Sequence, residues 1–130
     1  MVLKRGIKLL DETVGQGAAA TKGDRVTFNM KLFLNRGDEV PLNEQQAQRV
    51  PGDLLRVVRD DMLIDHSITL GKRQAIAGIE DTLVGMQVGG YRKVRVSPHL
   101  AYREQGVPGL IPKNAILIIE LWLRDIVVAL

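Results

Sequence analysis

Few side chains in this sequence stand in an arrangement that performs conventional catalysis. His66 and His99 have no acidic or histidine partner at the spacing of metal ligands, so each is expected to be a surface or packing residue. Asp60 and Asp61, with Asp65 nearby, match no calcium-loop spacing, and a solvated face is the better interpretation. The chain has no cysteine, which excludes thiolate zinc sites. We therefore expect neither a metal nor a cofactor.

The residues that best suggest a function are one tyrosine and two apolar residues on a loop. Tyr102 is one of two tyrosines and begins a long loop, although a tyrosine beside a loop often only bonds a backbone carbonyl. Leu110 and Ile111 lie between two prolines on the same loop. An apolar pair at such a place favours contact with a partner. The apolar tip therefore predicts contact with a partner.

The composition is that of one soluble globular domain. The chain has 130 residues, 45% hydrophobic and 25% charged, enough for a hydrophobic core. Its net charge of +3 comes from scattered residues, with no basic run interleaved with aromatics, so nucleic-acid binding is not expected. The first ten residues do not resemble a secretory signal, and residues 116–130 are too short and charged to span a bilayer. We expect a cytoplasmic location, with a periplasmic one or a removed targeting segment left open.

Alternation of apolar and polar residues predicts most of the strands. Residues 25–34 and 92–98 alternate cleanly, and residues 115–128 carry Leu117, Ile119, Leu121 and Leu123 on one face. Residues 3–10 have strand-like apolar content, and residues 35–38 form a turn in which Gly37 supplies positive φ. These segments predict an antiparallel sheet.

The middle of the chain contains the predicted helix and the least readable segment. Ile76, Ile79, Leu83 and Met86 recur at helical spacing, which predicts a helix over 76–86 that Gly89 and Gly90 stop. No Lys-Ser or Lys-Thr pair follows these glycines, so they form no phosphate loop. Residues 44–49 fit a short capped helix, whereas residues 54–64 fit strand or helix equally well. The fold class is α+β: one domain over 1–130, with five or six antiparallel strands curled around one short helix and a variable segment at about 41–65.

The stretch LGKRQAIAGIEDTLVGMQVGGYRKVRVSPHLAYREQGVPGLIPKNAILIIELWL, residues 70–123, resembles an FKBP-type (immunophilin) domain. The resemblance rests on three segments in the family's order and spacing: Leu70-Gly71 with Ile76 and Gly78; Met86, Val88 and Gly89 before a basic strand ending at Ser97-Pro98; and Ala101-Tyr102 before the loop Pro108-Gly109-Leu110-Ile111-Pro112. Residues 26–40 resemble the preceding strand and turn, so the resemblance covers most of the chain except residues 41–65.

The resemblance implies rotation about the bond that precedes proline, a protein-folding reaction performed by a rotamase. The barrier of ~18–20 kcal/mol comes from the partial double bond of the amide, and an apolar pocket with hydrogen bonds to the twisted carbonyl lowers it. The catalytic donors it implies are the Tyr102 hydroxyl and the Ile76 backbone N–H. The substrate-binding residues it implies are Met30, Val40, His66, Ile79, Leu110, Ile111 and Ile119.

Several of these positions depart from the family pattern. Ile79 stands where the family often has tryptophan, Met30 where it has tyrosine, and Val40 and Ile119 where it has phenylalanine. The family's aspartate falls at Pro41. The aliphatic pocket leaves two functions open, namely an active peptidyl-prolyl isomerase acting on proline-containing polypeptides and a non-catalytic, chaperone-like peptide-binding module. Turnover on a short X-Pro peptide separates the two.

The last strand also predicts an association surface. Period two sends Ile118 and Trp122 to the outer face if Leu117 and Ile119 point inward. Such a pair predicts a weak homodimer or partner contact. The alternative is a monomer whose N-terminal segment, through Val2 or Ile7, folds back over Trp122.

Overall fold

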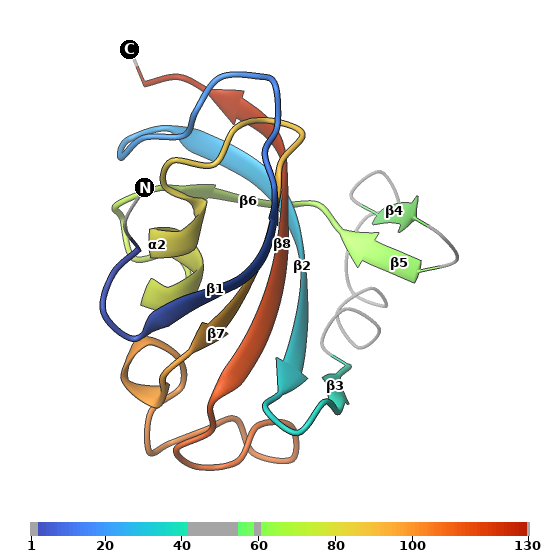
Figure 1. The fold of residues 1–130 in the computed structure, drawn as a ribbon, viewed down its shortest axis with the longest axis vertical. Coiled ribbons are helices and arrows are strands. Elements are labelled where there is room, and N and C mark those ends of the chain that lie inside the picture. The colour runs from blue at the N-terminus through green and yellow to red at the C-terminus, as the bar shows by residue number, and fades with distance from the viewer. Residues whose placement is uncertain (1–2, 42–54, 59–60, 130) are drawn as a thin grey trace.

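The computed structural model of the protein describes residues 3–41, 55–58 and 61–129, and its main body is one curled antiparallel sheet of six strands (Figure 1). Five strands run in the order β1 (Ile7–Thr13), β7 (Tyr91–Val96), β8 (Leu117–Val127), β2 (Arg25–Leu34) and β3 (Glu39–Val40). The sixth strand, β6 (His66–Thr69), pairs with the start of β2, whereas β3 pairs with its end. The predicted α+β class and antiparallel sheet are confirmed.

A short helix, α2 (Ala77–Leu83), lies against the inner face of this sheet and closes the core. The alternating residues of β2, β7 and β8 point to the helix as period two predicts, and Val94, Val96, Leu117, Ile119 and Leu121 are 0% exposed. Gly78 allows the close approach, because a Cβ there would lie 2.5 Å from Val96 Cγ1 and 3.0 Å from the Leu100 carbonyl oxygen. The sequence therefore packs an aliphatic inner face directly on the helix.

The helix is shorter than the predicted span of 76–86. Ile76 is its N-cap, and Val84 turns to extended backbone at φ −60° and ψ 126°. Gly85 follows with φ +87°, so the helix ends before the Gly89-Gly90 pair that was predicted to stop it. Met86 is still buried, but it belongs to the loop after the helix.

The first strand also differs from its prediction, since it spans Ile7–Thr13 and not residues 3–10. Residues 4–7 form a turn in which the Ile7 N–H donates to the Lys4 carbonyl at 3.0 Å, which delays entry into the sheet. Pairing with β7 is then interrupted between Leu9 and Asp11, so Leu10 is the extra residue of a β-bulge. A 3₁₀ turn, η2 (Pro98–Leu100), follows β7.

The segment that the sequence left undecided contains two strands, β4 (Leu55–Val58) and β5 (Asp61–Ile64), which pair as a separate two-stranded sheet. This hairpin stands on the opposite side of the main sheet from α2 (Figure 1). The helix expected at 44–49 lies outside the described residues. Within the described ranges, no helix has the length and apolar content needed to cross a bilayer.

Candidate functional site

Eight of the nine residues predicted for the site belong to the hydrophobic core or pack against it, and His66 stacks on the core residue Phe28, but the nine differ in accessibility. Val40, Ile79, Ile111 and Ile119 are core residues, at most 4% exposed. The other five are partly exposed: Met30, His66, Ile76, Tyr102 and Leu110. The second group is therefore accessible from solvent, and the first group forms the closed layer beneath.

Tyr102 lies after η2, and its ring packs against the core. Its hydroxyl makes no hydrogen bond to any residue that the structure describes. Burial raises the pKa of the Tyr102 phenol above its ordinary value of 10.0, so the hydroxyl keeps its proton at neutral pH. The side chain is thus a protonated donor without an internal acceptor, which does not support the alternative in which it only bonds a backbone carbonyl.

The Ile76 N–H is a second donor that bonds no acceptor in the described part of the chain, although the Ile76 carbonyl accepts from Ile79 and Glu80. Glu80 fixes the loop that leads to Ile76. Its buried carboxylate accepts from the Gly71 N–H at 2.9 Å and the Ala75 N–H at 3.2 Å. Glu80 was not among the predicted residues. The one feature of the sequence that could have pointed to it is its place in the first turn of the helix, where an acidic side chain is favoured.

The loop that carries Leu110 and Ile111 is closed by its own backbone. Val107 and Ile111 exchange two hydrogen bonds at 2.8–2.9 Å, and the Asn114 N–H donates to the Arg103 carbonyl at 2.8 Å. These bonds hold Ile111 in the core while Leu110 stays partly exposed. The loop therefore presents one apolar side chain at its tip and anchors the other.

His66 packs on Phe28 with ring centroids 5.5 Å apart and an interplanar angle of 30°. Its Nε2 atom is buried without a hydrogen-bond partner. Burial lowers the pKa of His66 below its ordinary value of 6.5, and the neighbouring negative charge of Asp65 opposes that shift. The histidine is thus a neutral aromatic of the inner face, as a packing residue would be.

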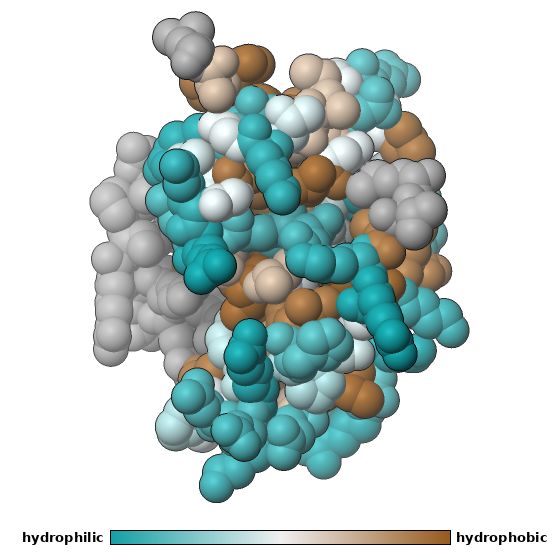
Figure 2. Space-filling model, turned by 90° about the vertical axis from the view of Figure 1, so that its left-hand side faces the viewer, coloured by the Kyte–Doolittle hydropathy of each residue, from teal (hydrophilic) through white to brown (hydrophobic). Residues whose placement is uncertain are grey.

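Figure 2 shows the side of the molecule that carries α2 and β1, where apolar surface forms small patches among hydrophilic side chains.

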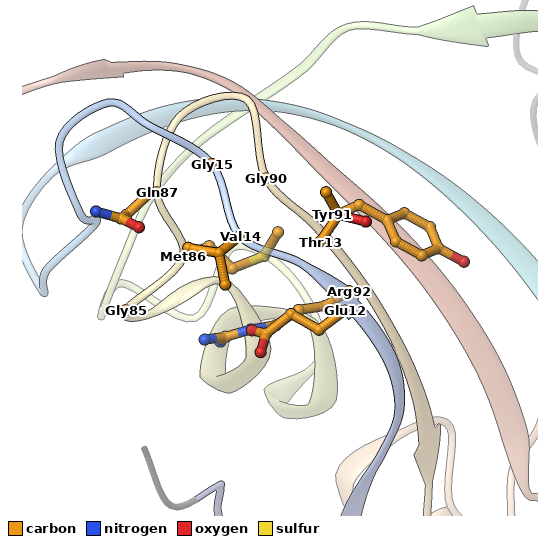
Figure 3. Close-up of a pocket in the computed structure, with 10 residues that line it drawn as sticks. All are labelled: Glu12, Thr13, Val14, Gly15, Gly85, Met86, Gln87, Gly90, Tyr91 and Arg92. Atoms are coloured by element: carbon orange, nitrogen blue, oxygen red, sulfur yellow. The ribbon is translucent and has the colours of Figure 1, made fainter.

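A separate cavity of about 260 Å³ lies between the end of β1 and the loop after α2, with Glu12 and Arg92 in its wall (Figure 3). Arg92 Nε donates to Glu12 at 2.8 Å and Arg92 Nη1 to the Thr82 carbonyl at 2.7 Å. This pair joins β1, β7 and the helix, a structural role.

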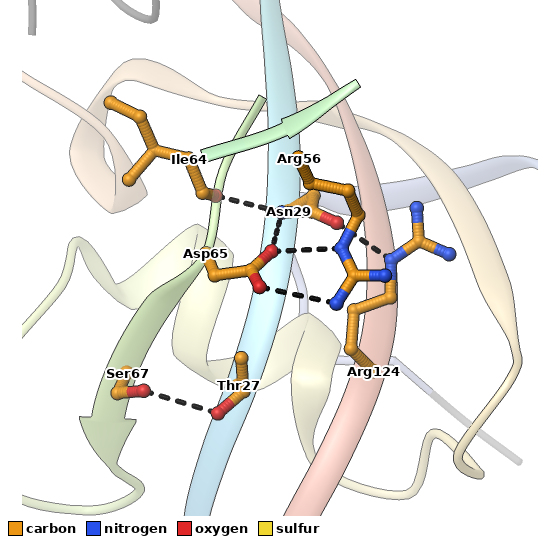
Figure 4. Close-up of polar contacts among 7 residues, drawn as sticks. All are labelled: Thr27, Asn29, Arg56, Ile64, Asp65, Ser67 and Arg124. Carbon is orange, nitrogen blue, oxygen red and sulfur yellow. Dashed lines mark hydrogen bonds and ion pairs between the residues drawn. The ribbon is translucent and has the colours of Figure 1, made fainter. Parts of the chain in front are cut away.

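The outer face carries a polar network that the sequence did not reveal (Figure 4). Asn29 is 0% exposed, and its amide donates to the Ile64 carbonyl and to Asp65 Oδ1, each at 2.7 Å. Arg56 binds the Asp65 carboxylate through two bonds of 3.0 and 3.1 Å. The prediction of a solvated face was therefore wrong for Asp65, whose side chain holds the β4–β5 hairpin to the sheet.

The outer residues of β8 are less exposed than predicted. Ile118 is only 8% exposed, and Trp122 packs on Tyr91 with ring centroids 5.3 Å apart. Ile7 does not cover Trp122, because it pairs with Val96 and packs in the inner core.

In residues 3–41, 55–58 and 61–129, no three acidic, histidine or cysteine side chains lie close enough together to hold a metal ion.

An antiparallel sheet curled over one short helix, with an aliphatic inner face, is consistent with the fold of the immunophilin class. Residues 16–124 match the model of the FKBP-type peptidyl-prolyl cis-trans isomerase family. The chain is 30% identical to FK506-binding protein 1A of Neurospora crassa over 88% of its own length and 83% of that relative's. It is 31% identical to FK506-binding protein 4 of Chaetomium thermophilum over 94% of its length, but it spans only 22% of that protein. This chain belongs to the FKBP-type peptidyl-prolyl cis-trans isomerase family.

Proposed function

We propose that this domain catalyses rotation about X-Pro bonds of polypeptides, using the Tyr102 hydroxyl and the Ile76 N–H as donors. The observation that carries the proposal is that both donors lack an acceptor in the described protein and adjoin an aliphatic core. An apolar surface disfavours the charge-separated planar amide, and a donor that bonds the twisted carbonyl favours the transition state. No nucleophile, base or metal takes part in this mechanism.

The raised pKa of Tyr102 supports this assignment, because a phenol that stays protonated remains a donor over the neutral and mildly alkaline range. Met30, His66 and Leu110 are the accessible side chains for the substrate ring and its neighbours, whereas Ile79 and Ile119 form the floor. Because that floor is 3% and 0% exposed, the ring enters only shallowly unless the floor moves. We therefore expect weak turnover and poor binding of macrolide immunosuppressants.

Turnover of a proline-containing tetrapeptide, followed from its cis form, tests the proposal. Tyr102→Phe should slow kcat/KM by roughly twofold to tenfold, since one neutral hydrogen bond contributes about 0.5–1.5 kcal/mol. Ile79→Trp should raise turnover if the aliphatic floor is limiting. If the wild-type protein binds the peptide without accelerating rotation, catalysis is excluded. The remaining function would then be that of a non-catalytic peptide-binding module, which the closed floor of the pocket favours.

We propose further that the domain is a monomer and not a homodimer through Ile118 and Trp122. Ile118 is nearly buried and Trp122 is partly covered by Tyr91, so the pair presents little apolar surface for self-association. Sedimentation of the wild type and of Trp122→Ser at high concentration tests this. A wild-type dimer that Trp122→Ser dissociates would restore the dimer interpretation.

A further inference from the structure

The pairing of four strands arranges the outer face of the sheet in rows. One row contains Lys8, Arg95, Ile118 and Phe33, as neighbours across β1, β7, β8 and β2. The next row contains Asp11, Lys93, Glu120 and Lys31 on the same four strands. An apolar pair in the first row thus lies beside a row of alternating charges.

The β-bulge at Leu10 changes what lies between these rows. Leu10 is unpaired in the ladder, is 37% exposed, and lines an open hollow of about 300 Å³ with Ile118 and Phe33. Gly37 and Lys93 also line it. This volume lies at the small end of ligand sites, so it suits one apolar side chain.

Three of the cations in these rows have no ion-pair partner among the described residues. Lys93 and Lys8 form no ion pair with any residue in the described ranges, and the Arg95 guanidinium bonds only the neutral Asn35 side chain, at 3.2 Å. The nearby acids are Asp11, Glu120 and Glu39. Glu120 accepts the Tyr91 hydroxyl at 2.5 Å, and Glu39, the β3 partner of Phe33, lies 3.7 Å from Lys31 Nζ. Lys93 therefore lines the hollow, and Lys8 and Arg95, in the same row as Ile118 and Phe33, are two further cations free to pair with an acidic ligand.

The far side of the face is occupied by the β4–β5 hairpin. Lys31 Nζ binds Asp61 at 2.9 Å, and the Asn29 amide binds the Ile64 carbonyl, so the hairpin stands over the β2 ends of the charged rows. A broad, flat partner cannot lie across this face. A narrow extended segment fits along β7 and β8.

We propose that this hollow docks a short acidic segment of another polypeptide, with one apolar side chain seated between Leu10, Phe33 and Ile118. Carboxylates on either side of that side chain pair with Lys8, Lys93 and Arg95. The site is separate from the inner face and does not depend on isomerase activity. Charge complementarity selects the partner, because a basic or neutral segment gains nothing from the three cations.

Binding of proline-free labelled peptides, measured by fluorescence anisotropy at low salt, tests the proposal. The peptide EDLED should bind, whereas EDSED and KKLKK should bind at least about tenfold more weakly. Lys93→Glu should weaken EDLED about tenfold, because it removes an attraction and adds a repulsion. The matched control Lys22→Glu, an exposed lysine in the loop before β2, should change it less than about twofold.

Amide chemical shifts locate the bound peptide and identify a different occupant. EDLED should shift the amides of Leu10, Gly37, Lys93 and Ile118, and Leu10→Asp should abolish those shifts with the rest of the spectrum intact. Equal binding of EDSED, or shifts confined to Tyr102 and Leu110, would overturn the proposal. So would the same shifts on raising protein concentration without peptide, since a second copy would then be the occupant.

Discussion

Two buried polar residues, Arg92 on the inner face and Asn29 on the outer face, occupy similar places in the sequence and join different parts of the fold. Each stands in a strand and is at most 6% exposed. Arg92 joins β1, β7 and the end of α2, which are parts of the main sheet and its helix. Asn29 joins β2 to the β4–β5 hairpin, which lies outside the main sheet. Burial alone therefore does not tell which contact holds the fold and which holds an accessory element.

Arg92→Leu should give the largest effect. The substitution leaves the Thr82 carbonyl and the Glu12 carboxylate without their partner, and we expect unfolding to become easier by about 2–3 kcal/mol. The loss stays below the usual cost for a fully buried pair, because the Glu12 side chain is 31% exposed and returns to water. Urea denaturation followed by tryptophan fluorescence measures it.

Arg95→Leu is the matched control, since it removes a cation from the outer face of the same strand. It should change stability by no more than about 0.5 kcal/mol. Equal losses of unfolding free energy in Arg92→Leu and Arg95→Leu would show that the face of the strand on which the arginine lies does not determine its contribution to stability.

Asn29→Ala should have a smaller and local effect. It removes the bonds to Ile64, Asp65 and Arg124 but leaves the Arg56–Asp65 ion pair, so we expect a loss of about 1–2 kcal/mol. Hydrogen exchange should rise in β4 and β5 and stay unchanged in α2 and β7.

Thr27→Val controls for this change, because it removes the Thr27–Ser67 bond of 3.1 Å on the same strand and face without touching the hairpin (Figure 4). Its hairpin exchange should equal that of the wild type. If Asn29→Ala accelerates exchange in α2 as much as in the hairpin, the hairpin is part of the main folding unit.

The inner face could be predicted from sequence because its signal is local. Alternation over residues 25–34 and 117–123 identifies the core without any knowledge of the partners. Tyr102 and the Leu110-Ile111 tip were identified as site candidates because they stand in one loop with a recognisable pattern, and their catalytic roles stay predictions.

The outer face could not be predicted, because its contacts join residues far apart in the chain. Arg124 and Asn29 are 95 residues apart, and Arg95 and Asn35 are 60 apart. The hairpin was undecided because residues 54–64 show no clean period and no glycine at the turn. The Leu10 bulge has no sequence signal either, so the hollow beside it appears only once the register is known.

His66 is the exception to the comparison, since it is an inner-face polar residue whose buried Nε2 has no partner. Protonation would place a charge beside Phe28 in a desolvated site, with only Asp65 to compensate it. Phenylalanine at this position would keep the ring stacking on Phe28 without a titratable group.

His66→Phe should therefore change the pH dependence of stability more than stability at neutral pH. Because the pKa of His66 is lowered in the folded state, the unfolded chain binds more protons as pH falls through the ordinary value of 6.5. The wild type should lose stability between about pH 7 and pH 5, by at most about 1.4 kcal/mol per pH unit, and the variant should lose less. Asp65, whose pKa the Arg56 hydrogen bond lowers from 3.8, adds its loss of stability only at more acid pH, so the pH windows of His66 and Asp65 separate.

Urea midpoints across this range, with His99→Gln as the exposed control, measure the difference. Parallel pH profiles for wild type and His66→Phe would mean that His66 is accommodated in its charged form, and that the inner face tolerates an uncompensated cation.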